Sequence, residues 1–303
     1  MFAMKMRQDS AFARWRGAPW VWPVTGFVVL WSILVVVPLV LLVFYSFLQV
    51  RGFKVDWTFN LDTWARVFES GRWQVTTRTL RIAVTVTLIE LLIAFPFSLW
   101  LAKACKSKIV KAVVLTLLTI PFFLDVSSRT IVWRPIFGTQ GPLNSVLVDL
   151  GLVDGPIEWL LFSEFAVHFG MIAPYFPTMV FPVFLVLSLI DDEYIEASRD
   201  LGASPLQTLS HVTIPLAMPG IMAGIVFTLV PTMAEYAVPQ LMGGFTVNLL
   251  GRSVESALTA LKYPTAAALS TFIIALLAAL LAALVLLLHR RGGLAGVFGA
   301  LSR

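Results

Sequence analysis

Charged residues are scarce in this chain. Only 13% of its 303 residues are Asp, Glu, Lys or Arg, against roughly 25% in soluble domains. Hydrophobic residues make up 58% of the chain, and the mean hydropathy is +0.88. A soluble enzyme of this length needs more polar surface, and disordered or fibrous chains have other compositions. The sequence therefore excludes these classes and indicates a protein whose solvent is the lipid bilayer.

The residues that usually carry bond chemistry are also few. Cys105 is the single cysteine, so neither an internal disulfide nor a multi-cysteine metal site can form. The three histidines, His168, His211 and His289, lie far apart and lack the HExxH spacing of zinc proteases. The sequence has no G-x-S-x-G elbow and no G-x-x-x-x-G-K-[ST] phosphate-binding loop. We therefore expect no catalytic residue, metal site or cofactor in this chain.

The formal net charge of +5 comes from basic residues that lie in short clusters between apolar runs. This arrangement is typical of membrane flanks and not of a surface that binds nucleic acid. Four lysines crowd residues 103–111, Arg290 and Arg291 end the last apolar run, and the N-terminal tail is also basic. The excess of basic residues in cytoplasmic loops predicts that these places are cytoplasmic, although several arginines between 51 and 81 lie toward the opposite side.

Six long windows, each with at most one charge, predict six membrane-spanning helices. With the flanks of these windows included, the working bounds of the six spans are 24–48, 78–102, 112–134, 165–190, 214–236 and 263–288. We therefore expect an all-α polytopic membrane protein. A cytoplasmic tail at 1–23 precedes one membrane domain at 24–288, and a second cytoplasmic tail occupies 289–303.

Glycine and proline refine the fifth window. The apolar run continues past its span, but Pro239 and the Gly243-Gly244 pair favour an irregular or re-entrant segment over a second full helix. Earlier in the same window, Gly220 and Gly224 form a G-x-x-x-G run. This spacing predicts close helix packing, either inside the subunit or across a dimer.

The segment 191–211 is the most informative part of the chain. It is polar, lies between two predicted spans and reads DDEYIEASRDLGASPLQTLSH. Leu201-Gly202 is expected to end one short helix, and Ser204-Pro205 can start another, with serine as the N-cap and proline in the first turn. A plain connection would need only a few residues. The sequence therefore predicts two short helices that meet at Gly202 and form a cytoplasmic docking surface.

This segment resembles a known motif. Glu196-Ala197-Ser198, three residues, Gly202, nine residues and Val212-Thr213-Ile214-Pro215 are similar to the EAA motif of ABC importer permeases. Ser198 replaces the second alanine of that motif, and Val212 and Ile214 are aliphatic replacements. Three further segments resemble the spermidine/putrescine branch of these permeases: Ser128–Trp133, Gly141–Asn144 and Glu235–Gly244.

The resemblance implies a type I importer of the bacterial inner membrane, with this chain as one multi-pass permease subunit whose termini are both cytoplasmic. It also implies a second permease subunit, different from this chain in many such importers, two cytoplasmic ATPase subunits that bind ATP and Mg, and an extracytoplasmic substrate-binding protein. The residues implied to couple this chain to the ATPase are Glu196, Ala197, Ser198, Gly202 and Pro215. Polyamines or related small organic cations are the implied substrates.

Three acidic residues, Glu90, Asp125 and Glu235, lie within predicted spans. Intramembrane acids usually face the bundle interior or water, so carboxylates along the pathway would attract a cation, with Tyr236 and Trp133 as cation–π faces. Two alternatives stay open. Each acid could pair with a basic residue of the partner permease or with Arg78, Arg81 or Arg129 here, and Trp133 could serve aromatic packing alone. Arg129 could also attract an anionic substrate.

Other functions also stay open at this point. Similar permeases carry opines, amino-acid derivatives, thiamine and iron. A secondary transporter subunit would likewise place acids in its spans, but it would not need an elbow on which an ATPase docks. An intramembrane enzyme would need a catalytic constellation, which this sequence lacks.

Overall fold

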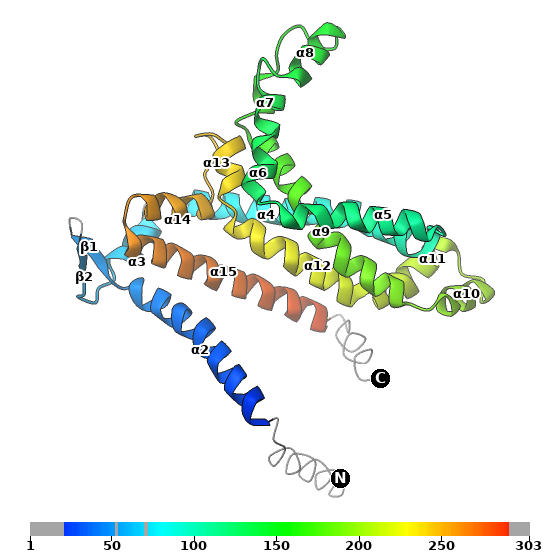
Figure 1. Ribbon diagram of the computed structural model, residues 1–303, viewed down its shortest axis with the longest axis horizontal. Helices are drawn as coiled ribbons and strands as arrows, with labels where there is room; N and C mark the ends of the chain where they lie inside the picture. Colours follow the sequence, from blue (N-terminus) through cyan, green and yellow to red (C-terminus); the bar gives the residue numbers. More distant parts are fainter. Residues whose placement is uncertain (1–20, 52–53, 70–71, 291–303) are drawn as a thin grey trace, which may run out of the picture.

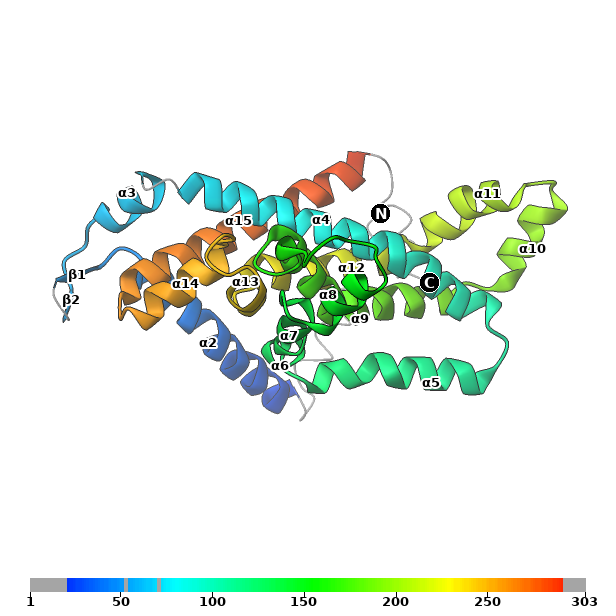
Figure 2. The ribbon, with the colours of Figure 1, turned by 90° about the horizontal axis from the view of Figure 1, so that it is seen from above.

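The computed structural model describes residues 21–51, 54–69 and 72–290. Four long helices, α4 (Arg72–Leu99), α9 (Glu164–Leu189), α12 (Ile214–Ala234) and α15 (Tyr263–Arg290), form an elongated bundle, and α2 (Val21–Tyr45) diverges from it (Figure 1). The short helices α10 (Asp192–Asp200) and α11 (Pro205–Thr208) lie at one end of the bundle, and α14 (Leu250–Thr259) with a small β-hairpin lies at the other (Figures 1 and 2). Most of the two predicted tails, including Arg291 and the basic residues before residue 21, lies outside the described residues. The described part holds five helices long and apolar enough to cross a membrane, or six if one bent pair is a single span.

Five of the predicted spans are confirmed as long helices. They are α2 (Val21–Tyr45), α4 (Arg72–Leu99), α9 (Glu164–Leu189), α12 (Ile214–Ala234) and α15 (Tyr263–Arg290). Each is apolar over most of its length, because lipid and neighbouring helices surround it. Prolines inside α4, α9 and α12 do not break these helices.

The third predicted span, 112–134, is a bent series of shorter helices and not one continuous helix. The chain forms α5 (Lys108–Thr119), a 3-10 turn η2 (Ile120–Phe123), α6 (Val126–Ile131) and α7 (Trp133–Phe137). The axis bends by 104° between the parts before and after residues 124–125. Leu124 is extended, and the carboxylate of Asp125 accepts a hydrogen bond from the Ser127 amide at 2.9 Å. Asp125 therefore starts a new helix where a continuous one was expected.

The core lies where α4, α9 and α12 meet. Met179, Val183 and Leu187 of α9 are completely buried there, with Ala94 of α4 and Ala217 of α12. Glycines let α12 approach α9 closely. A Cβ at Gly220 would lie 2.6 Å from the Pro182 carbonyl oxygen, and one at Gly224 would lie 2.7 Å from Sδ of Met179. The G-x-x-x-G run therefore serves packing inside the subunit.

The remaining segments are short, and two of them are strands. Strands β1 (Gln49–Arg51) and β2 (Lys54–Asp56) pair antiparallel, which adds a small hairpin to the expected all-α fold. The remaining short elements are α3 (Asp62–Glu69), α8 (Pro142–Asp149), η3 (Glu158–Leu160), α13 (Ala237–Met242) and α14 (Leu250–Thr259). The six-residue α13 and the irregular chain after it confirm that no second full helix follows α12.

Candidate functional site

The predicted elbow is present at the end of the bundle. Helix α10 (Asp192–Asp200) ends at Leu201, and Gly202 adopts a φ of +82°. Amides of Gly202 and Ala203 then donate to the carbonyl oxygens of Arg199 and Ser198, at 2.8 and 3.1 Å. Nothing lies within 4 Å of a Cβ placed on Gly202, so the positive φ is what favours glycine here. The two short helices meet at the residue that the sequence indicated.

The second half of the elbow is also capped as expected. Ser204 and Gln207 form a capping box at the start of α11 (Pro205–Thr208), with Pro205 in its first turn. The Ser198 and Thr208 hydroxyls are 3.0 Å apart, which joins α10 to α11 across the bend. A π-helical turn, η4 (Leu209–Thr213), then leads into α12. The elbow is therefore a locally stabilised unit and not a loose loop.

The outer surface of the elbow carries both charge and apolar area. Glu196 and Ala197 are exposed, and so is Pro215 at the start of α12. Leu201 is 88% exposed and Leu206 is 74% exposed. Large apolar side chains at such exposure, beside an acidic helix, are typical of a protein-binding surface.

Inside the bundle, Glu235 lies at the break between α12 and α13. Its Oε1 accepts hydrogen bonds from the amides of Ala237, at 2.7 Å, and Val238, at 3.2 Å. Its Oε2 accepts a hydrogen bond from the hydroxyl of Tyr175 on α9. Glu235 is only 7% exposed, so one carboxylate both caps α13 and joins it to α9.

Glu90 of α4 lies in the core and is completely buried. Its Oε2 accepts a long hydrogen bond from the Thr228 hydroxyl of α12 at 3.3 Å, and its Oε1 has no hydrogen-bond partner among the described residues. The Thr228 hydroxyl is also 3.1 Å from that of Thr178 on α9. These three side chains form a buried polar cluster at the meeting point of α4, α9 and α12.

In the described part of the chain, Glu90, Asp125 and Glu235 form no ion pair with Arg78, Arg81 or Arg129. Arg78 and Arg81 pair with Glu164 at the start of α9, at 3.1 and 2.5 Å. Nη1 of Arg129 donates to the Pro174 carbonyl oxygen at 3.1 Å, while Asp125 caps its own helix. The structure therefore brings Arg129 to α9 and leaves Asp125 exposed at the 104° bend.

The two aromatic residues have different surroundings. The Trp133 ring centroid is 4.8 Å from that of Phe169 and 5.6 Å from that of Phe137, so Trp133 packs against two phenylalanine rings. Tyr236 follows Glu235 and is 47% exposed. Of these two rings, Tyr236 is the more open to a ligand.

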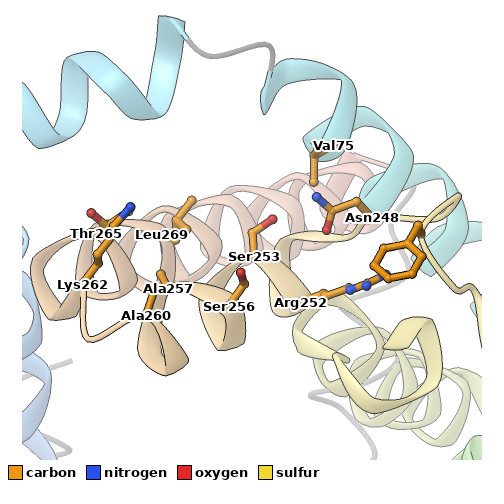
Figure 3. Close-up of a pocket in the computed structure, with 11 residues that line it drawn as sticks. Val75, Asn248, Arg252, Ser253, Ser256, Ala257, Ala260, Lys262, Thr265 and Leu269 are labelled. Carbon is orange, nitrogen blue, oxygen red and sulfur yellow. The ribbon is translucent and has the colours of Figure 1, made fainter. Parts of the chain in front are cut away.

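At the end of the bundle away from the elbow, α14 and the start of α15 border a hollow of about 580 Å³. Figure 3 shows hydroxyl, amide and basic side chains around it, among them Asn248, Arg252, Ser253 and Lys262. Arg252 donates to the carbonyl oxygen of Gly244, so this arginine holds the chain that follows α13. Among the residues that the structure describes, no acidic one lines this hollow.

Several of these residues carry no signal in the sequence pattern. Tyr175, Thr178 and Thr228 sit inside apolar helices, and only the fold shows that they contact Glu235 or Glu90. Glu164 lies at the edge of a predicted span, but only the packing of α4 against α9 shows that it pairs with Arg78 and Arg81.

Most of this sequence is similar to those of known proteins. Residues 96–291 match the family described as "Binding-protein-dependent transport system inner membrane component". The spermidine/putrescine transport system permease protein PotB of Escherichia coli (strain K12) is 35% identical over 201 residues, 66% of this chain and 72% of that protein. PotB of Haemophilus influenzae (strain ATCC 51907 / DSM 11121 / KW20 / Rd) is 31% identical over 249 residues, 82% of this chain and 86% of that protein.

Solved structures match the fold. A crystal structure of a bacterial ABC transporter involved in the import of the acidic polysaccharide alginate has a TM-score of 0.64 and 15% identity, over 92% of this chain and 99% of that chain. The alginate transporter in complex with an alginate pentasaccharide-bound periplasmic protein has a TM-score of 0.62 and 15% identity, over 86% of this chain and 91% of that chain. At this identity the match concerns the fold and not the substrate.

Proposed function

This chain belongs to the family of binding-protein-dependent transport system inner membrane components, and we propose that it imports polyamines or a related small organic cation. It is a multi-pass permease subunit with an ABC importer fold. The relatives named above are spermidine/putrescine permeases, and this similarity supports the substrate class.

One observation on the chain itself supports a cationic substrate. Glu90, Asp125 and Glu235 lie in or beside the spanning helices, and none forms an ion pair with Lys, Arg or His in the described ranges. An ammonium group that enters a narrow pathway loses hydration, and carboxylates of this kind can replace the lost water dipoles. Exposed Asp125 and Tyr236 are the side chains most open to such a group.

We further infer that the elbow binds a cytoplasmic ATPase, one of two in the transporter. Glu196 offers a charge for a basic residue, and Leu201 and Leu206 offer exposed apolar area around it. The hollow beside α14 lies at the opposite end of the bundle from the elbow (Figure 1). We infer that this end faces the extracytoplasmic side, where a substrate-binding protein would dock. The transporter is completed by a second permease subunit, and both termini of this chain are cytoplasmic.

The experiment that tests the function is uptake by the reconstituted transporter with its ATPase, second permease and binding protein. Labelled spermidine and putrescine are compared with a neutral amino-acid derivative and an anionic solute of similar size. ATP-dependent uptake of the polyamines alone is the expected result. ATP-dependent uptake of the anionic solute would contradict the substrate class and direct attention to Arg129.

A further inference from the structure

Lys103 lies at the junction between α4 and the elbow. Helix α4 ends in a π-helical turn, η1 (Trp100–Ala104), in which the amide of Cys105 donates to the Trp100 carbonyl oxygen at 2.8 Å. The wider turn changes the direction of the side chains that follow α4, and π-helical turns are frequent at functional sites. It places Lys103 beside the start of α10.

Lys103 contacts two helix ends at once. Its Nζ lies 2.6 Å from Oδ1 of Asp192, the first residue of α10, and also donates to the carbonyl oxygen of Ile190 at the end of α9. The Lys103 side chain is only 16% exposed. On the other side of the same turn, Nζ of Lys111 donates to the Ala102 carbonyl oxygen at 3.1 Å, which joins α5 to it.

The charges of Lys103 and Asp192 suit the two helix ends that they contact. An ammonium at the C-terminus of α9 satisfies a carbonyl that has no partner within the helix, and a carboxylate in the first turn of α10 suits the positive end of that helix. The hydrogen bond and charge of Lys103 lower the pKa of the Asp192 carboxyl. Asp192 therefore stays ionised, and the contact persists, at any pH near neutrality.

Covalent connections already join the elbow to α9 and α12, whereas α4 reaches it through side chains. We propose that Lys103 is a coupling residue: its bonds to Ile190 and Asp192 make α4 move with α10 when the ATPase moves the elbow. This inference rests on the proposed function, because it needs an ATPase at the elbow. Without the contact, ATP hydrolysis would still move α9 and α12, but α4 would follow less completely.

The test uses the complete transporter with its ATPase, second permease and binding protein. Lys103→Met removes the contact, Lys103→Arg keeps a donor and a charge, and Asp192→Asn removes the charge of its partner. Lys106→Met is the matched control, because Lys106 is exposed and lies in the same basic loop. Three quantities are measured: ATPase co-purified with the permease, ATP hydrolysed and substrate taken up. ATP-driven uptake by the wild-type transporter is established first, so a failure of the proposed function is seen before any variant is compared.

We expect substrate uptake per ATP hydrolysed to fall about three- to fivefold in Lys103→Met, the size that a partly exposed ion pair supports. The fall should be smaller in Asp192→Asn, because that variant keeps the hydrogen bond from Lys103 to Ile190. The double variant should fall no further than Lys103→Met alone, because Asp192 acts through its contact with Lys103. Lys103→Arg and Lys106→Met should keep the wild-type ratio, and all variants should co-purify the same amount of ATPase. A wild-type ratio in Lys103→Met, an equal fall in Lys106→Met, or loss of the ATPase from Lys103→Met would overturn the inference.

Discussion

The hydroxyl of Tyr175 on α9 donates a hydrogen bond to Oε2 of Glu235, the residue at which α12 ends. The other carboxylate oxygen of Glu235 accepts from two amides at the start of α13. One buried acid thus has a charge that can attract a cation and hydrogen bonds that hold two helices. These two roles can be separated by substitution.

Glu235→Gln and Tyr175→Phe should give opposite profiles. Glutamine keeps an oxygen for the α13 amides and removes the charge, so uptake of a cationic substrate should fall about tenfold, the effect of about 1.4 kcal/mol at the barrier, with little change in melting temperature. Phenylalanine leaves the charge and removes a hydrogen bond to it, which costs about 1.5–3 kcal/mol of stability. Its melting temperature should fall more than its uptake. Equal losses of uptake in both variants would mean that Glu235 acts through structure alone.

Substitutions in the elbow should uncouple the ATPase from this chain. Glu196→Lys reverses the exposed charge on α10, and Gly202→Val places a β-branched residue at a φ of +82°, which costs roughly 1–2 kcal/mol. Both variants should insert in the membrane in normal amounts, co-purify less ATPase and transport poorly. Arg199→Ser, a change of another exposed residue of α10, is the control. Normal transport by Glu196→Lys and Gly202→Val together would remove the docking role from the elbow.

Packing at the crossing of α9 and α12 should tolerate no larger residue at Gly220. A Cβ there meets the Pro182 carbonyl oxygen at 2.6 Å and Cβ of Val186 at 2.9 Å. Gly220→Val should therefore destabilise the subunit by about 1–3 kcal/mol or more, as overpacking does elsewhere, and lower the melting temperature of the purified permease. Gly155→Val is the control, because nothing lies within 4 Å of a Cβ at Gly155. An unchanged melting temperature in Gly220→Val would place this contact outside the stabilising core.

Features with a local cause could be predicted from the sequence. Charge-free windows located the spanning helices, and glycine and serine located the elbow at Gly202 and Ser204, because span length, caps and positive φ depend on nearby residues. The bend at Asp125 was missed, since hydropathy continues across it and only the cap shows the break. The partners of Glu90 and Glu235 were missed for another reason. They lie on helices distant in sequence, and composition carries no information on which faces meet.

Cys105 provides a test of orientation. It lies between α4 and α5, in the lysine-rich turn, and its side chain is partly exposed. If this turn is cytoplasmic, a membrane-impermeant maleimide should label Cys105 in inside-out vesicles and not in intact spheroplasts. Because Cys105 is the only cysteine in the sequence, Cys105→Ser gives the background in both preparations. Labelling in intact spheroplasts would reverse the assigned orientation.

Asp125 allows charge and structure to be separated at the 104° bend. Its carboxylate caps α6 and is exposed, so it can act both as a helix cap and as a group that attracts a cation. Asparagine caps a helix about as well as aspartate, whereas alanine does not and costs about 1 kcal/mol. Asp125→Asn should therefore keep the melting temperature and lower the uptake of a cationic substrate, by less than Glu235→Gln because water screens an exposed charge. Asp125→Ala should lower both quantities. If Asp125→Asn transports spermidine like the wild type while Asp125→Ala does not, the residue serves the bend alone, and the pathway charge must come from Glu90, Glu235 or the second permease.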